Sequence, residues 1–311
     1  MPIAREGMKS HTVDLGGPVH YVDFGGSGRP IVLVHGLGGS HLNWLPVGRR
    51  LAAHGHVVAL DLAGHGRTPS APGRTAHVDD NRRLLGRFIE TVAKAPAVLM
   101  GNSMGGFLSM AEAAAEPDKV TALVLVGPAV PNTKVLSWHP AVVALFAGYA
   151  LPGLGGALMR WRYARGPEKL VRDTLRLCCV DASLVPPDAV LAHVELARER
   201  LGNGGGRGRE FLEAQRSLMA ALIRPRRFYR MVARVRAPAL IVQGGRDRLV
   251  RVAAARVLAR ARPDWRFEML EGVGHVPQLE APERFLAAVE PWLRGTEALL
   301  SRGAPSRTSE G

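Results

Sequence analysis

A chain of 311 residues, of which 47% are hydrophobic, is long enough to bury one large core, and we expect a single domain that carries an insertion. The formal net charge of +14 would suit a nucleic-acid partner, but the arginines are spread along the whole chain without a nucleic-acid-binding motif, so we expect no such partner. The first seventeen residues are polar and lack the apolar stretch of a secretory signal, which predicts a cytoplasmic protein.

The first half of the chain alternates short apolar runs with helical patterns, which is typical of a mostly parallel sheet covered by helices. The predicted strands are Val19–Phe24, Ile31–Val34, Val57–Leu60, Ala97–Met100 and Val120–Val126. Between the last two, good helix formers from Phe107 to Ala115 predict a helix that ends before Pro117.

After Gly127 the alternation disappears, and helical patterns without a clear strand follow. The glycine-rich run Gly202–Gly208 inside this segment is read as a loop in preference to a hinge. The alternation then resumes with a strand at Ala239–Gln243, a helix at Val252–Ala261, a strand at Arg266–Leu270 and a helix at Pro282–Leu293. We therefore expect an α/β core domain at 10–127 and 237–294, a helical insertion at 128–236 and a flexible tail at 295–311.

One segment of the insertion, Val135–Met159, contains no charged residue and is long enough to cross a membrane. Pro140, Pro152 and several glycines would interrupt a spanning helix, so we do not predict one. The adjacent cysteines Cys178 and Cys179 lie too close in sequence for an unstrained disulfide and are predicted to be free thiols.

The strongest chemical signal is the Gly-x-Ser-x-Gly match at Gly101–Gly105, with Ser103 at its centre. Such a match is weak alone, but this one lies between a predicted strand and a predicted helix, where a sharp turn would expose the serine hydroxyl. Small residues are needed there because the turn forces neighbouring backbone segments together. Ser103 is therefore predicted to be a nucleophile, in preference to an incidental serine in a glycine-rich turn.

A serine nucleophile needs a base, and His275 is the best candidate among the eleven histidines. It follows the last predicted strand, where loops gather at the carboxyl edge of the sheet. His65 also follows a strand and is the rival, although Gly64 and Gly66 suit a tight structural turn.

The third member of such a triad is a carboxylate that orients the histidine. Asp247 follows the strand Ala239–Gln243 and lies between Ser103 and His275 in sequence, as this role requires. Two alternatives stay open: Asp247 as an ordinary helix N-cap, and Asp61 as the orienting carboxylate.

An acyl-transfer intermediate also needs two backbone N–H donors for its oxyanion. Met104, directly after Ser103 at a helix start, would supply one, and Leu37 in a glycine-rich turn would supply the other. No closely spaced set of His, Cys and carboxylate residues is typical of a metal site, so we expect neither a metal nor a cofactor.

Together these segments closely resemble the α/β-hydrolase superfamily over about residues 10–294. The resemblance is carried by His35-Gly36, Asp61 with Gly64-His65-Gly66, the Ser103 turn, Asp247 and His275-Val276-Pro277. It implies a catalytic triad of Ser103, Asp247 and His275, and an oxyanion hole formed by the amides of Leu37 and Met104. The insertion resembles the helical cap of that family only in position and helical character.

The resemblance implies a serine hydrolase, and we expect it to cleave carboxylic esters of small to medium apolar acyl groups. Dehalogenases and epoxide hydrolases of this fold have an aspartate where Ser103 stands, which argues against those chemistries. Carbon–carbon bond hydrolases of aromatic ring-cleavage products share the Gly-Asn-Ser-Met-Gly-Gly string and are the alternative, although Val276 stands where they usually have tryptophan. A non-catalytic ligand-binding relative is a further alternative, and the oligomeric state stays open.

The apolar stretch of the insertion is predicted to overhang the Ser103 pocket and to form a wall for an acyl chain. Its apolar residues are Val142, Val143, Leu145, Phe146, Leu151, Leu154 and Leu158. Two other interpretations stay open, namely packing of the insertion onto the main domain and a less favoured peripheral contact with a membrane surface beside Arg160, Arg162 and Arg165.

Overall fold

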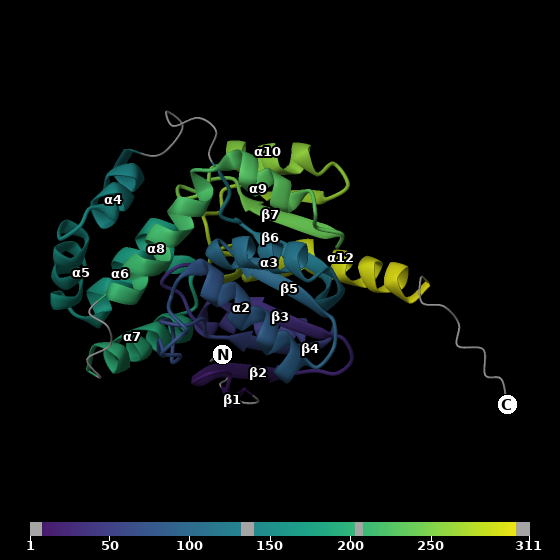
Figure 1. Cartoon of the computed structure of the whole chain (residues 1–311), viewed down its shortest axis with the longest axis horizontal. Helices are drawn as coiled ribbons and strands as arrows, with labels where there is room; N and C mark the ends of the chain where they lie inside the picture. Colours follow the sequence, from purple (N-terminus) through teal and green to yellow (C-terminus); the bar gives the residue numbers. More distant parts are fainter. Residues whose placement is uncertain (1–7, 132–139, 203–207, 303–311) are drawn as a thin grey trace.

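The protein is built on one sheet with the strand order β1-β2-β4-β3-β5-β6-β7-β8 (Figure 1). The computed structural model describes residues 8–131, 140–202 and 208–302. The strands are β1 (Lys9–Asp14), β2 (Pro18–Gly25), β3 (Pro30–Val34), β4 (His56–Leu60), β5 (Ala97–Asn102), β6 (Val120–Val126), β7 (Ala239–Gly244) and β8 (Arg266–Leu270). β1 and β2 are antiparallel to their neighbours, and the other pairs are parallel. The predicted α/β fold is confirmed.

The central strands are apolar on both sides because helices cover both faces of the sheet. In β3 every residue is buried, and alternate side chains enter different cores: Val32 and Val34 on one face, Ile31 and Leu33 on the other. The period of two along a strand produces this division. The sheet is therefore a rigid, dry platform, and its carboxyl edge is where side chains can reach solvent.

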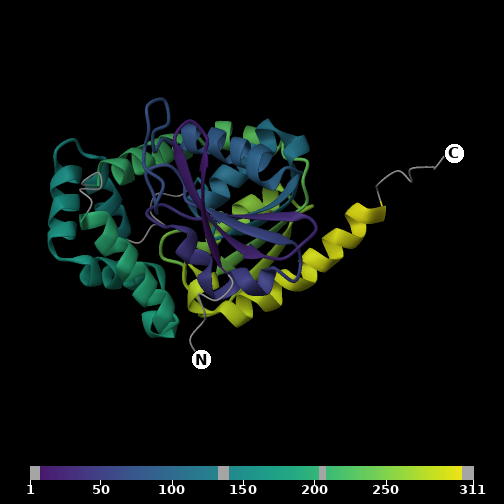
Figure 2. The ribbon, with the colours of Figure 1, turned by 90° about the horizontal axis from the view of Figure 1, so that it is seen from below.

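Helices from both halves of the chain cover the two faces (Figures 1 and 2). On the face of Val32 lie α2 (Val78–Phe88), α3 (Met104–Ala115) and α10 (Val252–Ala261); on the other lie α1 (Leu45–Leu51) and α12 (Pro282–Arg302). Phe88 of α2 and Phe285 of α12 are fully buried and anchor the respective cores. Aromatic side chains of this size contribute much of the apolar area that stabilises each layer.

Every described element between β6 and β7 is helical. These elements are α4 (Pro140–Ala150), α5 (Leu154–Ala164), α6 (Pro167–Cys178), a short 3-10 turn (Ala182–Leu184), α7 (Pro187–Gly202), α8 (Arg209–Leu222) and α9 (Pro225–Val232). Figures 1 and 2 both place α4 and α5 farthest from the sheet, whereas Phe228 and Val232 of α9 pack into the main core. Part of the predicted loop at Gly202–Gly208 lies outside the described residues.

Two elements differ from the sequence expectation. β1 was not predicted, because its exposed, polar residues at the sheet edge give no apolar run. A tail was expected from Gly295, but α12 continues to Arg302. The residues after Gly295 include Glu, Ala and Leu, whose helix propensity outweighs the cost of about 1 kcal/mol for one glycine.

No single helix among residues 8–131, 140–202 and 208–302 is long and apolar enough to cross a membrane. The segments Val142–Ala150 and Leu154–Ala164 pass that test only as a pair, and they are bent by 115° at the break between them. Residues 135–139 of the predicted apolar stretch lie outside the described part of the chain.

Candidate active site

Ser103 is the single residue between the end of β5 and the start of α3. Its backbone has φ 54° and ψ −116°, a conformation that costs a non-glycine residue about 1–3 kcal/mol. The turn is tight: a Cβ on Gly105 would lie 2.1 Å from the carbonyl oxygen of Val34, and one on Gly101 would lie 2.4 Å from that of Gly105. Glycine is therefore required at both positions, as the motif predicted.

Asn102, which sequence reasoning assigned no role, connects this turn to the histidine loop. Its buried side-chain amide donates to the backbone oxygens of Val126 at 3.0 Å and of His275 at 3.2 Å. The amide of Ser103 also donates to the Val126 oxygen, at 2.9 Å. The strained serine is thus held by bonds from two neighbouring segments, and only its place inside the motif could have pointed to Asn102.

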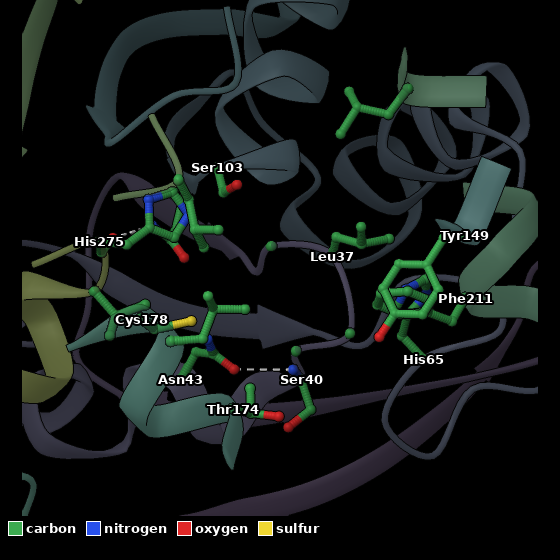
Figure 3. Close-up of a pocket in the computed structure, with 18 of the residues that line it drawn as sticks. Leu37, Ser40, Asn43, His65, Ser103, Tyr149, Thr174, Cys178, Phe211 and His275 are labelled. Atoms are coloured by element: carbon green, nitrogen blue, oxygen red, sulfur yellow. Dashed lines mark hydrogen bonds between the residues drawn. The ribbon is translucent and has the colours of Figure 1, made fainter. Parts of the chain in front are cut away.

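His275 and Asp247 lie together, as the sequence predicted for the two residues. His275 Nδ1 donates to Asp247 Oδ2 at 2.7 Å, and both side chains are buried (Figure 3 shows His275). Because a carboxylate only accepts, Nδ1 carries the proton and Nε2 is left as the basic nitrogen. This is the tautomer that a general base needs.

Asp247 has three further donors. Its Oδ1 accepts from the amides of Leu249 and Val250 at 2.8 and 2.9 Å, and its Oδ2 accepts from Gln243 Nε2 at 3.0 Å. These bonds fix the direction of the carboxylate toward His275. The N-cap alternative was wrong, because the N-cap of α10 is Arg251 and no side chain caps that helix. The two amide contacts instead order the turn at Leu249 and Val250, so the same carboxylate shapes the loop before α10 and holds the histidine.

The histidine loop is attached to the insertion through two contacts. The amide of His275 donates to the carbonyl oxygen of Cys178 at 2.6 Å. Buried Glu280 accepts from the amide of Gly274 at 2.7 Å with one oxygen and from those of Val180 and Asp181 at 2.8 and 2.9 Å with the other. Glu280 was not predicted, because two of its partners lie about a hundred residues away and no local pattern marks it.

A cavity of about 300 Å³ brings Ser103 and His275 to one surface (Figure 3). Leu37 lines it too, and Met104 is buried at the first position of α3. A Cβ on Gly36 would lie 3.1 Å from the Cβ of Ser103, so the Leu37 turn passes directly beside the serine. The two predicted oxyanion donors therefore belong to backbone segments that flank Ser103.

Of the predicted acyl wall, only part faces the cavity. Val142, Leu145 and Phe146 line it, while Leu158 is half-buried against the small cluster around Tyr149. Val143, Leu151 and Leu154 instead are exposed to solvent, so their assignment to the wall was wrong. A helix presents its residues on all sides, and an entirely apolar sequence does not reveal which side faces inward.

His65, the rival base, also lines the cavity (Figure 3), and its ring lies 5.4 Å from that of His35 between centroids. Its Nδ1 donates to the carbonyl of Ala63 at 3.0 Å, and no carboxylate of the described residues bonds to the ring. Burial, with the nearby His35, lowers the pKa of His65 to about 3. The ring of His65 therefore stays neutral, and its N–H is bonded to a backbone carbonyl of its own turn. The N–H of His275 is instead bonded to the Asp247 carboxylate.

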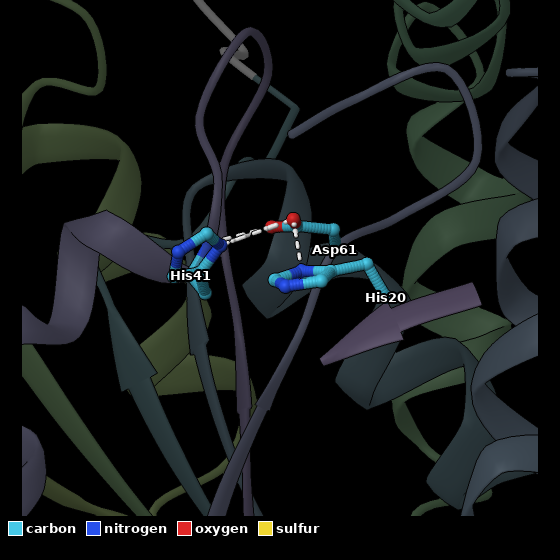
Figure 4. Close-up of side chains that lie close together, drawn as sticks. All are labelled: His20, His41 and Asp61. Carbon is cyan, nitrogen blue, oxygen red and sulfur yellow. Dashed lines mark hydrogen bonds and ion pairs between the residues drawn. The ribbon is translucent and has the colours of Figure 1, made fainter. Parts of the chain in front are cut away.

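Asp61, the rival carboxylate, belongs to a separate network (Figure 4). It bonds His20 Nδ1 at 2.8 Å and His41 Nδ1 at 3.0 Å, and accepts from the amides of His41 and Arg67 at 2.7 and 2.8 Å. Burial alone would raise the pKa of Asp61, but His41 and His20 outweigh burial and lower it well below the usual value. Asp61 joins β2, the segment before α1 and the Gly64–Arg67 turn, and its bonds do not include His275.

The same three side chains are the described group whose spacing could admit a metal ion, with ligand atoms within 4.8 Å of one another. Asp61 already bonds the Nδ1 atoms of both histidines, and His20 Nε2 lies 2.7 Å from Ser10 Oγ. We therefore read the group as a hydrogen-bonded network that stabilises the fold.

Comparison with known proteins identifies the relatives of the chain. A model of the alpha/beta hydrolase family matches residues 31–288. A 2-hydroxy-6-oxononadienedioate/2-hydroxy-6-oxononatrienedioate hydrolase of Burkholderia vietnamiensis is 28% identical over 283 residues, 89% of this chain and 91% of the relative. Lipase 1 of Psychrobacter immobilis is 25% identical over 278 residues, 88% and 80% of the two chains. A haloalkane dehalogenase structure from Bradyrhizobium elkani, 23% identical, has a TM-score of 0.78 over 94% of this chain and 99% of its own, which shows the shared fold alone.

Proposed function

Because this hydrolase belongs to the alpha/beta hydrolase family, we propose that it is a serine hydrolase that cleaves carboxylic esters of small to medium apolar acyl groups. One observation carries the proposal: the strained Ser103 shares a cavity with His275, and Nδ1 of that histidine is bonded to Asp247, which leaves its Nε2 unprotonated. A serine hydroxyl is a poor nucleophile alone, and a histidine with a bare Nε2 is the base that activates it.

The proposed reaction has two steps. The Ser103 oxygen attacks the ester carbonyl while His275 Nε2 takes the hydroxyl proton, and the amides of Leu37 and Met104 stabilise the oxyanion. Collapse of the tetrahedral intermediate breaks the bond between the acyl carbon and the alcohol oxygen, and the alcohol leaves with the proton from His275. Water, deprotonated by the same nitrogen, then cleaves the acyl-enzyme and regenerates Ser103.

The lining of the cavity supports an apolar acyl group. Besides Val142, Leu145 and Phe146 of α4, it includes Leu196, Leu218 and Leu279 from three other helices. A volume of about 300 Å³ suits a small or medium acyl chain, and each buried methylene adds about 0.8 kcal/mol of binding. Among the described residues, the neutral Nε2 of His65 has no hydrogen-bond partner, and it is a buried acceptor in this lining.

The Burkholderia relative favours a second candidate, hydrolysis of a carbon–carbon bond in a ring-cleavage product. The substrates in the name of that relative are dicarboxylates, which need cationic partners. Arg162, Arg200 and Arg251 line the cavity. Arg162 bonds Tyr149 and Thr174, and Arg200 bonds the carbonyl oxygens of Gly64 and Gly66, so two of these three cations are already engaged by neighbouring groups. The engagement of these two and the mainly apolar lining favour an ester substrate, whereas Arg251 is the residue that a dicarboxylate would use.

Two measurements test the proposal. A fluorophosphonate should label the wild type rapidly and leave Ser103→Ala unlabelled, while Ser40→Ala, which removes another serine lining the cavity, should keep the label. Inert Ser103 in the wild type would refute a serine hydrolase. A screen of acyl esters of increasing length, with an aromatic dienoate ketone included, separates the reactions: turnover of the ketone alone would replace the ester assignment by the carbon–carbon one.

A further inference from the structure

The outward side of α4 is apolar from Val143 to its end. The described exposed residues recur on one side of the helix and include no charged or hydrogen-bonding side chain; they are Val143, Ala144, Ala147 and Ala150, followed by Leu151 directly after the helix. The solvent side of a helix in a globular protein is normally polar. Leu151 keeps 54% of its surface exposed, so the insertion does not cover this side.

The outward side of α5 continues the same surface. Leu154, Ala157 and Trp161 are exposed there, Leu154 at 46% and Trp161 at 58%. The helices meet at Pro152 and Gly153, where the chain direction bends sharply, by 115°. Figures 1 and 2 show the pair at the end of the molecule remote from the sheet, where no other described element covers it. We call these outward sides of α4 and α5 the distal face.

The inward sides of these helices are satisfied by packing. Val142 and Tyr149 of α4 and Met159 of α5 are buried, and all three line the cavity that holds Ser103. Tyr149 and Met159 also pack with Leu212 of α8. The helices therefore have two apolar sides with different surroundings, and the outer one is not required by the fold.

Arginines border the distal face. Arg160 and Arg165 are exposed on α5, and Arg165 lies over the ring of Trp161 at 4.4 Å. Exposed Arg216 of α8 donates to the carbonyl oxygens of Tyr149 and Leu151 at the end of α4. Long cationic side chains around an apolar surface suit anionic headgroups above an acyl layer, and an amphipathic aromatic ring suits their boundary.

We propose that the distal face docks on an anionic lipid surface, with Leu151, Leu154 and Trp161 entering the headgroup layer and the bordering arginines binding lipid phosphates. A bent apolar pair with a cationic rim lies in such an interface without crossing it. The net charge of +14 adds long-range attraction to the same surface. Docking would also bring the cavity, which lies on the inner side of the same helices, next to a medium in which apolar esters concentrate.

The experiment is co-sedimentation of the full chain with vesicles of phosphatidylcholine plus phosphatidylglycerol, and with vesicles of phosphatidylcholine alone. The wild type is expected to bind the anionic vesicles and to dissociate as salt is raised. The double variant Leu151→Ser with Trp161→Ser should bind at least about tenfold more weakly, because both apolar anchors are lost. Arg160→Gln should weaken binding to anionic vesicles only.

A matched control distinguishes this face from general surface hydrophobicity. Leu191→Ser removes a leucine with 56% exposure from α7, outside the distal face, and should bind as the wild type does. Wild-type chain that stays in the supernatant, or a double variant that binds unchanged, would overturn the proposal. Light scattering supplies a third contradicting outcome. If the wild type is a dimer, the double variant is a monomer and neither protein binds vesicles, the distal face joins two copies of the chain and the proposal is wrong.

The test is independent of the proposed hydrolysis. Leu151 and Trp161, the residues changed in the double variant, are not part of the cavity lining, so turnover of a water-soluble acetyl ester should be unchanged in that variant. Vesicle binding without any ester turnover would refute the ester assignment and leave the docking proposal standing, and the reverse result would do the opposite.

Discussion

The sheet core and the helical insertion differ in how completely their apolar side chains are buried. In the core, β3 and β5 are completely buried, and their ends hold backbone turns so tight that Gly101 and Gly105 admit no side chain. In the insertion, α4 is apolar on both sides, and Leu151 and Trp161 are largely exposed. The core therefore fixes the geometry of the candidate chemistry, whereas the insertion supplies the apolar surfaces on which the proposals for substrate and lipid binding rest.

The two regions are not independent, because the C-terminal end of α6 reaches the histidine loop. A Cβ on Gly274 would lie 2.4 Å from the carbonyl oxygen of Cys178, which also accepts from the His275 amide. The position of the candidate base therefore depends on the insertion through these backbone contacts. Substitutions in the two regions should show how far their contributions can be separated.

The largest effect is expected from the core residues that would carry the reaction. Ser103→Ala and His275→Ala should each reduce ester turnover by roughly 10³- to 10⁶-fold, because nucleophile and base act as one unit. The midpoint temperature of thermal unfolding should be nearly unchanged or slightly higher for Ser103→Ala, because alanine at this position keeps the same positive φ and therefore about the same backbone strain. Steady-state kinetics measure this, and near-wild-type turnover in either variant would refute its assignment.

The two carboxylates of the core should separate into one that affects turnover and one that affects stability. Asp247→Asn should lower kcat by about 10⁴-fold, because an amide that donates to His275 favours the wrong tautomer. Asp61→Asn should retain most of the activity of the folded enzyme but lower the free energy of unfolding by about 3 kcal/mol, since four donor groups converge on the buried carboxylate. Denaturant unfolding together with kinetics on both variants would show the assignments reversed if Asp61 were the orienting group.

Sequence reasoning predicted the parts of the site that are local in the chain and missed those that are not. The Ser103 turn is visible because strand, glycines and helix follow one another within a short segment. Pairing of Asp247 with His275 was predicted because parallel strands end at one edge. Glu280 and Asn102 act on backbone groups distant in sequence, and such groups carry no residue-type signal. The side of α4 that faces inward was equally hidden, since both sides are apolar.

Glu280 tests how strongly the insertion and the histidine loop are coupled. Glu280→Gln keeps the shape but places an NH₂ group against at least one of three amide donors, so the free energy of unfolding should fall by about 1–3 kcal/mol. As a positioning residue for His275, it should also lower kcat about tenfold with little change in KM and shift the pH profile of the basic nitrogen. The matched control is Glu283→Gln, an exposed residue three positions further along the chain, paired at the surface with Arg50. A variant that loses stability but keeps its kcat and pH profile would make Glu280 purely structural.

The smallest change in activity is expected from substitutions on the two sides of the α4 and α5 pair. Phe146 lines the cavity, and Phe146→Ser should weaken the preference for medium over acetyl esters by roughly fourfold for each acyl methylene that the ring no longer covers, while acetyl-ester turnover stays nearly intact. Leu154 lies on the distal face at 46% exposure, so Leu154→Ser should leave the chain-length profile unchanged. The ratio of kcat/KM across a series of acyl lengths measures both. A changed profile in Leu154→Ser would mean that α5 turns this side toward the substrate when it binds, and an unchanged profile in a well-folded Phe146→Ser would remove the acyl wall from the insertion.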